Sequence, residues 1–116
     1  MTEPNACVEV IVTAEDAAWL AEWTRQLVTD RLVACGHNIA SIRATYRWEG
    51  EIHDDPQARV ELHTRAELVP EIVARANQDH ADDVPCVIAL PISGGHPAYL
   101  KWVHEETRPP TSRPEA

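Results

Sequence analysis

The segment 79–83 holds the densest group of metal-ligating side chains in the sequence and reads Asp-His-Ala-Asp-Asp. An imidazole beside carboxylates offers the nitrogen and oxygen donors that suit Zn²⁺, Ni²⁺ or Cu²⁺. We therefore predict a metal site on His80, with Asp79 and Asp83 as further ligands. The alternative interpretation is a solvated loop in which Asp82 or Asp83 fixes a turn.

A second, softer pair of donors is Cys35 and His37, which are two residues apart. A thiolate together with an imidazole can hold copper, whereas the alternative is a small buried cysteine that closes a helix. The sequence has three cysteines in all, widely spaced and without a C-x-x-C pair. That spacing is neither a disulfide framework nor a zinc finger, and free thiols fit a reducing compartment.

Other chemistries have less support in the sequence. The Ser-Gly-Gly segment at 93–95 is too short for a phosphate-binding loop and lacks a following lysine. No Gly-x-Ser-x-Gly motif occurs, and no cysteine and histidine can be assigned as nucleophile and base. Tyr46, Trp48 and Trp102 can stack on a ligand, but aromatic residues more often fill an interface. We therefore expect a protein that is not an enzyme.

Composition limits the partners. The 116 residues suffice for one domain, which we place at 1–107, and the proline-rich segment 108–116 is predicted to be disordered. A formal net charge of −9 argues against nucleic-acid binding and is compatible with binding of cations.

No apolar run approaches the ~18 residues of a membrane span, so we expect no membrane association and a cytoplasmic location. The residues identify no protein partner.

One long hairpin is expected to organise the chain. Apolar and polar residues alternate strictly through 41–48, which is the period of a half-buried strand, and Glu49 with Gly50 supplies the turn. A strand over 38–48 would extend ~36 Å, whereas a chain of this size has a radius of gyration of about 13 Å. The arm would overhang its own domain with an unpaired edge, which indicates an oligomer.

The remaining elements are placed by periodicity. A β-branched run predicts a central strand at 7–12, and a capping box at 13–16 opens a helix over 15–34 that ends near Gly36. The returning hairpin strand resumes at 58–63 after a bend or bulge at 54–56. A second capping box at 64–67 precedes another helix. Because Pro70 belongs in the first turn of a helix, we expect this helix to start nearer Glu67 than Thr64. A strand at 84–92 and a helix at 98–106 follow. The order strand-helix-strand-strand-helix-strand predicts an α+β, ferredoxin-like fold with an extra C-terminal helix.

Several motifs occur in an order that resembles the CutA divalent-cation tolerance family. They are Val-Thr-Ala-Glu-Asp at 12–16, Leu-Val-Ala-Cys at 32–35, Tyr-Arg-Trp-Glu-Gly at 46–50, His-Thr-Arg at 63–65, Val-Pro-x-x-Ile-Ala-Leu-Pro at 84–91 and Tyr-Leu-x-Trp at 99–102. The resemblance implies a cytoplasmic homotrimer with hairpins paired between subunits, a likeness to the PII signalling proteins, and binding of divalent cations. We expect Cu²⁺ as the first choice and Zn²⁺ as the second. His80 matches a histidine of the family.

The chain also departs from the family pattern. His63 stands where the family usually has lysine, the segment 80–83 lacks the family's tyrosine, and Val12 replaces a first-strand cysteine that some members carry. A ligand cleft built on that lysine and tyrosine would therefore be remodelled. Two rival functions remain open. One is a PII-like small-molecule sensor that binds its ligand between subunits through His63, Arg65 and Trp48, and the other is a scaffold trimer with incidental metal binding.

Overall fold

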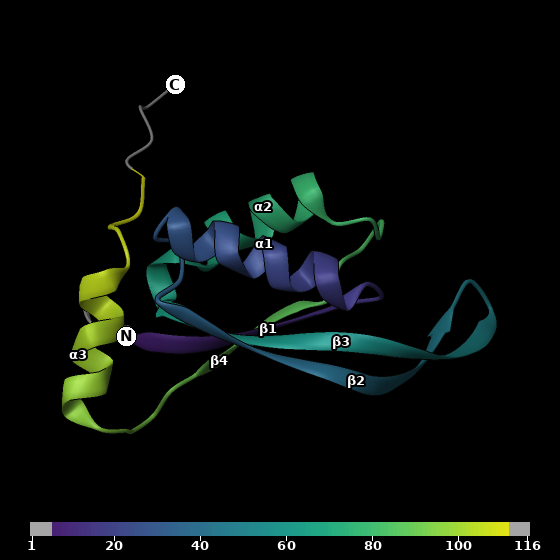
Figure 1. Ribbon diagram of the computed structural model, residues 1–116, viewed down its shortest axis with the longest axis horizontal. Coiled ribbons are helices and arrows are strands. Elements are labelled where there is room, and N and C mark those ends of the chain that lie inside the picture. The colour runs from purple at the N-terminus through teal and green to yellow at the C-terminus, as the bar shows by residue number, and fades with distance from the viewer. Residues whose placement is uncertain (1–5, 112–116) are drawn as a thin grey trace.

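The computed structural model describes residues 6–111 (Figure 1). The elements run in the order β1 (Cys7–Ala14), α1 (Ala17–Thr29), β2 (Cys35–Trp48), β3 (Glu51–Arg65), a 3-10 turn (Ala66–Leu68), α2 (Val69–Asp79), β4 (Val87–Pro91) and α3 (Pro97–Glu106). Within the described range, no helix is long and apolar enough to cross a bilayer.

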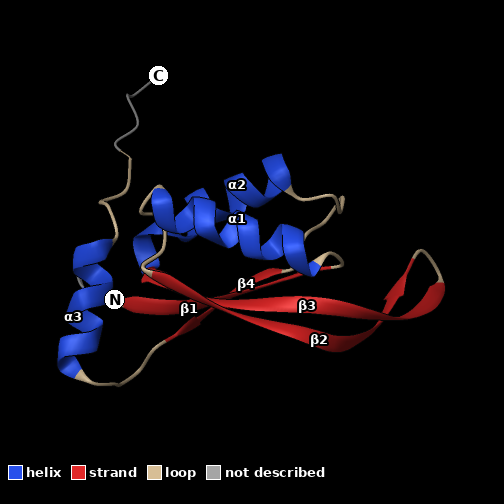
Figure 2. Cartoon of the chain, in the orientation of Figure 1, coloured by secondary structure: helices blue, strands red, loops and turns tan. Residues whose placement is uncertain are grey.

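The four strands form one antiparallel sheet in the order β2-β3-β1-β4. Helices α1 and α2 lie side by side over one face, and α3 packs at one end of the sheet (Figures 1 and 2). This arrangement confirms the predicted α+β class, the element order and the central position of β1. Both β2 and β4 are edge strands, so one edge of each is unpaired within the described chain.

The core lies between the sheet and the two helices. Alternation along β1 and β3 directs every second side chain toward the helices. Helices α1 and α2 each direct one stripe of apolar side chains toward the sheet. The largest fully buried members are Val10, Val12, Leu20, Trp23, Leu27, Leu32, Val33, Val60, Leu62, Leu68 and Ile72. Burying side chains of this size stabilises the fold by about 1.5–3 kcal/mol each. Val28, which follows the buried Leu27 on α1, is 39% exposed.

Helix α1 is shorter than predicted at both ends. Asp16 is its N-cap and accepts a hydrogen bond from the backbone N–H of Trp19, because Thr13 is still paired with Arg59 in the sheet. The helix ends at Thr29 and the chain reverses at Arg31, which has φ 61°. Gly36 therefore does not cap the helix. It lies in β2, where an added Cβ would be 2.5 Å from Cγ2 of Thr24 on α1.

The second predicted capping box is also part of a strand. Thr64 belongs to β3, and its hydroxyl donates to the carbonyl of Leu32 at 2.6 Å. Helix α2 begins at Val69 with Pro70 in its first turn, so the expectation that Pro70 delays the helix is confirmed. The predicted strand at 84–92 is shorter in the structure, where β4 spans Val87–Pro91.

The β2–β3 hairpin is continuous from Cys35 to Arg65. Glu49 and Gly50 have φ values of 51° and 81°, and positive φ at both central residues is the mark of a type I′ turn. Pro56 lies inside β3 opposite Arg43, and the irregularity predicted at 54–56 is found across the ladder, between Ala40 and Ile42 of β2. A bulge on the partner strand keeps β3 in register around its proline.

The hairpin extends beyond the region covered by α1 and α2 (Figure 1). The radius of gyration is 15.0 Å, larger than the roughly 13 Å of a compact domain of this length. Near the tip, Trp48 is 43% and Ile52 68% exposed. The predicted overhang is therefore present in the single chain, with an unpaired β2 edge and apolar side chains in solvent.

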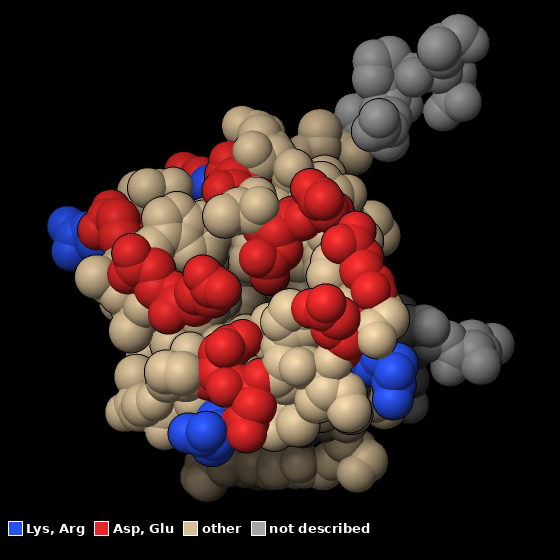
Figure 3. Space-filling model, turned by 90° about the vertical axis from the view of Figure 1, so that its right-hand side faces the viewer, with Lys and Arg blue, Asp and Glu red and all other residues tan. Residues whose placement is uncertain are grey.

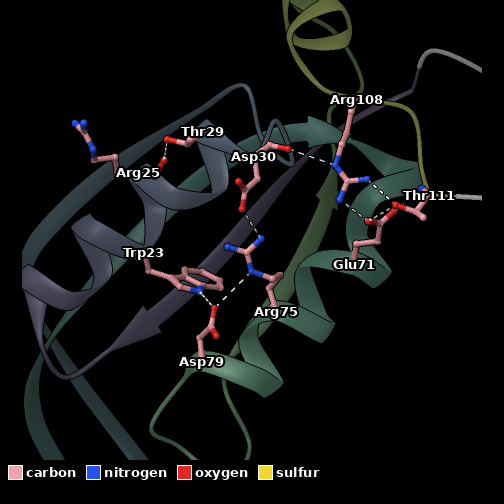
Figure 4. Close-up of polar contacts among 9 residues, drawn as sticks. All are labelled: Trp23, Arg25, Thr29, Asp30, Glu71, Arg75, Asp79, Arg108 and Thr111. Carbon is pink, nitrogen blue, oxygen red and sulfur yellow. Dashed lines mark hydrogen bonds and ion pairs between the residues drawn. The ribbon is translucent and has the colours of Figure 1, made fainter.

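The chain after α3 returns toward α2. Arg108 donates to Glu71 at 2.7 Å, and the backbone N–H of Thr111 donates to the same carboxylate at 2.9 Å (Figure 4). The sequence prediction of disorder began at Arg108, but Arg108 and Thr111 are hydrogen bonded to α2. Residues 112–116 lie outside the described residues, so the prediction stays untested there.

Candidate metal centre

Cys35, His37 and His63 are brought together on the sheet face opposite α1 and α2. Antiparallel pairing places Cys35 directly across from His63, and alternation places His37 on the same face two residues further along β2. One donor atom from each side chain lies within 4.8 Å of the other two. Cys35 and His63 are partly buried and His37 is exposed, so the group is reachable from solvent.

Tyr99 from α3 and Glu9 from β1 complete the surroundings of His63. The Tyr99 hydroxyl is 2.6 Å from Nδ1 of His63 and 3.2 Å from Sγ of Cys35, while a carboxylate oxygen of Glu9 is 3.2 Å from Nε2. An ionised carboxylate can only accept, so Nε2 carries the proton and donates to Glu9. The lone pair of Nδ1 then accepts from the Tyr99 hydroxyl, which accepts in turn from the Cys35 thiol.

Burial raises the pKa of Tyr99 well above its ordinary value. The hydroxyl therefore keeps its proton at neutral pH and remains a donor to His63. Glu9 holds the histidine in the tautomer whose Nδ1 faces Cys35, which is the arrangement by which carboxylates orient metal-binding histidines. A metal ion taking Nδ1 as a ligand must first displace the hydroxyl of Tyr99.

The donor set is one sulfur and two imidazole nitrogens. Thiolate and imidazole are ligands that Zn²⁺ and copper share, while Mg²⁺ and Ca²⁺ require oxygen donors. The three residues thus fit a borderline-soft divalent cation. The sequence predicts Cys35 and His37 as a pair and His63 apart from them, whereas the structure brings all three together.

His80 is not available as a ligand in this arrangement. Its side chain is 2% exposed; Nε2 donates to the carbonyl of Thr13 at 2.8 Å and Nδ1 accepts from the backbone N–H of Asp82 at 3.0 Å. With both ring nitrogens occupied, His80 anchors the loop after α2 to the end of β1. The ring also packs edge-on against Trp19.

Asp79 has a structural partner as well. Its carboxylate accepts from the indole N–H of Trp23 at 3.0 Å and lies 3.5 Å from Nε of Arg75 (Figure 4). Asp83 is exposed on the following loop. Within residues 6–111, the predicted set of His80, Asp79 and Asp83 forms no group of converging metal donors. The described geometry does not bring these three donors together, and metal binding by them stays a prediction.

The residues expected to line a small-molecule cleft lie apart. Trp48 pairs with Glu51 at the hairpin tip, whereas His63 pairs with Cys35 at the opposite end of the ladder. Arg65 donates to the backbone carbonyls of His104 and Thr107 and holds the end of α3. One chain does not assemble His63, Arg65 and Trp48 into a site.

Sequence reasoning missed Tyr99 and Glu9. A usable signal existed for Glu9, because strict alternation in β1 places it opposite in direction to Val8 and Val10. The position of Tyr99 follows from the docking of α3, which depends on contacts distant in sequence, such as Arg31 with the carbonyls of Glu105 and Glu106. No local pattern predicts that docking.

Comparison with known proteins places these features in context. A family model described as CutA1 divalent ion tolerance protein matches residues 8–106. The chain is 35% identical to the chloroplastic protein CutA of Arabidopsis thaliana over 92% of its own length and 58% of that protein. It is 38% identical to the divalent-cation tolerance protein CutA of Pyrococcus horikoshii over 72% of its own length and 81% of that protein.

The fold agrees with solved structures of the same group. The divalent cation tolerance protein Cut A1 from Thermus thermophilus superposes with a TM-score of 0.85 at 29% identity, covering 88% of this chain and 99% of that one. The chain spans slightly under three fifths of the length of its plant and mammalian relatives, 58% of the Arabidopsis protein and 59% of the mouse protein.

Proposed function

Because this chain belongs to the CutA1 divalent ion tolerance family, we propose that it binds a divalent cation through Cys35, His37 and His63. The observation that carries the proposal is the convergence of one sulfur and two nitrogen donors within 4.8 Å. Glu9 fixes the tautomer of His63, and Tyr99 occupies the position that the cation would take. We propose binding, rather than catalysis, as the activity.

Cu²⁺ is the first choice of cation and Zn²⁺ the second. A site of given nitrogen and sulfur donors binds Cu²⁺ more tightly than the other divalent ions of the first transition row, and Zn²⁺ accepts the same donors in tetrahedral geometry. Binding requires a deprotonated Cys35 and neutral histidines, so each bound ion releases protons. The ion would be held with Cys35 as the thiolate ligand.

We also propose that the protein is a homotrimer. The exposed β2 edge and the apolar side chains near the hairpin tip support assembly, because an unpaired edge of this length is otherwise a site of aggregation. The compartment we propose is the cytoplasm, since Cys7, Cys35 and Cys86 form no disulfide within the described residues. The Arabidopsis relative carries the word chloroplastic in its name, which describes that protein.

Isothermal titration of Zn²⁺ and Cu²⁺ into the wild type, Cys35→Ser and His63→Gln tests the metal site. Loss of the hydrogen-bond partner of a metal ligand weakens metal binding by roughly 10–100-fold. We expect each of these substitutions, which removes a ligand itself, to weaken metal binding by more than that. His53→Ala is the matched control, because His53 stacks on Tyr46 in the hairpin arm, outside the metal centre. Equal affinity of all variants, or weak uptake without preference among ions, would favour the scaffold function instead.

A further inference from the structure

The candidate metal centre consists of soft and borderline donors and has no oxygen ligand. Cys35 supplies one sulfur, and His37 and His63 supply two nitrogens, all from two neighbouring strands of one chain. Within residues 6–111, no carboxylate and no further histidine joins this group. One thiolate with two imidazoles is the donor set of protein sites that hold copper and exchange single electrons. The centre therefore has the ligands for a redox function that simple binding does not use.

The spacing of the donors already suits a single ion. Sγ of Cys35 lies 3.7 Å from Nδ1 of His63. When sulfur and nitrogen ligands lie at about 2.3 Å and about 2.0 Å from an ion, at angles between tetrahedral and trigonal, they are about 3.5–3.7 Å apart. Cys35 and His63 are thus placed as two ligands of one ion, and His37 completes the triangle.

The surroundings provide no strong fourth ligand. The carboxylate of Glu9 is turned toward Nε2 of His63 at 3.2 Å, on the side of the ring away from the other donors. A neutral hydroxyl, such as that of Tyr99 at 3.2 Å from Sγ of Cys35, is a weak ligand beside a thiolate. Ala34, the neighbour of Cys35 in the chain, belongs to a small buried apolar cluster. An ion held here keeps three strong protein ligands.

A soft set of three ligands accommodates both oxidation states of copper. Thiolate ligands favour Cu⁺, whereas Cu²⁺ on its own prefers a tetragonal set of nitrogen and oxygen ligands. The two paired strands fix the three donors and offer Cu²⁺ no tetragonal set. Gain or loss of one electron therefore requires little movement of the ligands, which is the condition for rapid and reversible electron exchange.

We propose that Cys35, His37 and His63 hold copper in both oxidation states, and that the protein accepts and returns single electrons there. This role rests on the metal binding proposed above and adds electron exchange to it. No covalent bond forms or breaks: an external one-electron donor reduces the bound Cu²⁺ to Cu⁺, and an external one-electron acceptor takes the electron back. All three donors belong to one chain and lie at the end of the β2–β3 ladder opposite the hairpin tip, so assembly of the arms does not remove them.

The charge of the surface decides which redox reagent suits the protein. The chain has a formal net charge of −9, and the face drawn in Figure 3 carries many acidic side chains and few basic ones. Such a field attracts cations and repels anions. A positively charged one-electron donor is therefore the appropriate probe for reduction.

The test loads the full chain, in its native oligomeric state and without oxygen, with one Cu²⁺ per chain. Cys86→Ser serves as the background, because the exposed thiol of Cys86 could otherwise bind or reduce copper. We expect an intense visible absorption band from the thiolate ligand and an EPR spectrum with the small copper hyperfine splitting of a thiolate-bound ion. The hexaammineruthenium(II) cation should bleach the band, and ferricyanide should restore it over repeated cycles.

Variants assign the signal to the three donors. In the same background, Cys35→Ser should abolish the absorption band even where copper still binds, and His63→Gln should also lose the band. His53→Ala is the control, because His53 stacks on Tyr46 in the hairpin arm, and this variant should keep both the band and the cycling. A band that survives Cys35→Ser would overturn the proposal.

Calorimetry on the same samples separates the possible failures. Tight binding of Cu²⁺ with weak visible absorption and a wide hyperfine splitting would show a tetragonal site, so metal binding would stand and the redox role would be wrong. Irreversible bleaching with oxidation of Cys35 would also overturn the redox role. Absence of copper binding would overturn the redox role together with the proposed function.

Discussion

The hydroxyl of Tyr99 lies 2.6 Å from Nδ1 of His63 and ties helix α3 to the candidate metal centre. The same helix is held at its far end by Arg31 and Arg65, whose guanidinium groups donate to backbone carbonyls near its C-terminus. A cation that binds Nδ1 replaces the Tyr99 contact, while the arginine contacts remain. Metal binding at the proposed site would therefore be coupled to the docking of α3 through one hydrogen bond.

Tyr99→Phe should tighten metal binding. The substitution removes the hydroxyl that occupies Nδ1 and keeps the aromatic ring in place. Because a net hydrogen bond contributes about 0.5–1.5 kcal/mol, we expect Zn²⁺ affinity to rise by about two- to tenfold. Calorimetry at fixed pH measures the change. Weaker binding by Tyr99→Phe would instead identify the tyrosine oxygen as a ligand, contrary to this account.

Glu9→Ala should weaken metal binding by about 10–100-fold, the usual effect of removing the hydrogen-bond partner of a metal-binding histidine. Without the carboxylate, nothing holds the proton of His63 on Nε2, and Nδ1 is protonated in part of the molecules. Glu22→Ala is the control, since Glu22 is an exposed residue of α1 on the other side of the sheet. The same loss in both variants would show a general charge effect.

Gly36→Ala should destabilise the fold by about 1–3 kcal/mol, as overpacking of a filled site does. The new Cβ would meet Cγ2 of Thr24 at 2.5 Å and Cδ2 of Leu62 at 3.0 Å. Gly94→Ala is the matched control, because an added Cβ there has no neighbour within 4 Å. Urea unfolding of both variants measures the difference in stability. Equal urea midpoints for Gly36→Ala and Gly94→Ala would contradict the packing of α1 on β2.

The contact between Glu71 and the segment 108–111 should depend on pH. Burial alone would raise the pKa of Glu71, but the hydrogen bonds from Thr111 and Arg108 outweigh it and lower the pKa below its ordinary value. A carboxylate with a lowered pKa stabilises the folded state above its unfolded pKa, and this stabilisation is lost as the pH falls through the folded pKa.

Glu71→Gln tests that dependence. We expect the variant to be less stable than the wild type at neutral pH by under about 1 kcal/mol, as for partly exposed ion pairs, and the difference to vanish in acid. Thermal unfolding at a series of pH values measures it. A difference that stays constant from neutral to acidic pH would assign the effect to packing rather than to the charge.

The hairpin arm predicts a trimer in solution. An equilibrium sedimentation experiment at micromolar concentration should give three times the monomer mass, and Trp48→Asp should shift the distribution toward smaller species because it places a charge beside the exposed apolar tip. A folded wild-type monomer under these conditions would remove the argument from the overhanging edge.

Local patterns in the sequence predicted most of the fold. Alternation through 41–48 and the Glu49–Gly50 turn fixed the hairpin, and Pro70 and Pro97 marked helix starts that the structure confirms. The prediction that Thr13 and Thr64 cap helices was wrong, because both residues take part in the strand ladder. A capping motif read from sequence does not show that its first residue is already paired in a sheet.

The site was less predictable, because it depends on contacts between distant residues. His80 looked like a ligand beside its acidic neighbours, but its partner is the carbonyl of Thr13, 67 residues away. Cys35 and His63 become neighbours through strand register, which no local motif specifies. The three donors could be named from their residue types, whereas their assembly required the sheet.

Anomalous diffraction from crystals grown with Zn²⁺ tests the central claim most directly. The account predicts a peak bonded to Sγ of Cys35 and to ring nitrogens of His37 and His63, at about 2.3 Å from the sulfur and about 2.0–2.1 Å from the nitrogens. It also predicts that the Tyr99 hydroxyl has moved away from Nδ1 of His63. A peak at His80, or one held by surface carboxylates while Cys35 remains hydrogen bonded to Tyr99, would contradict it.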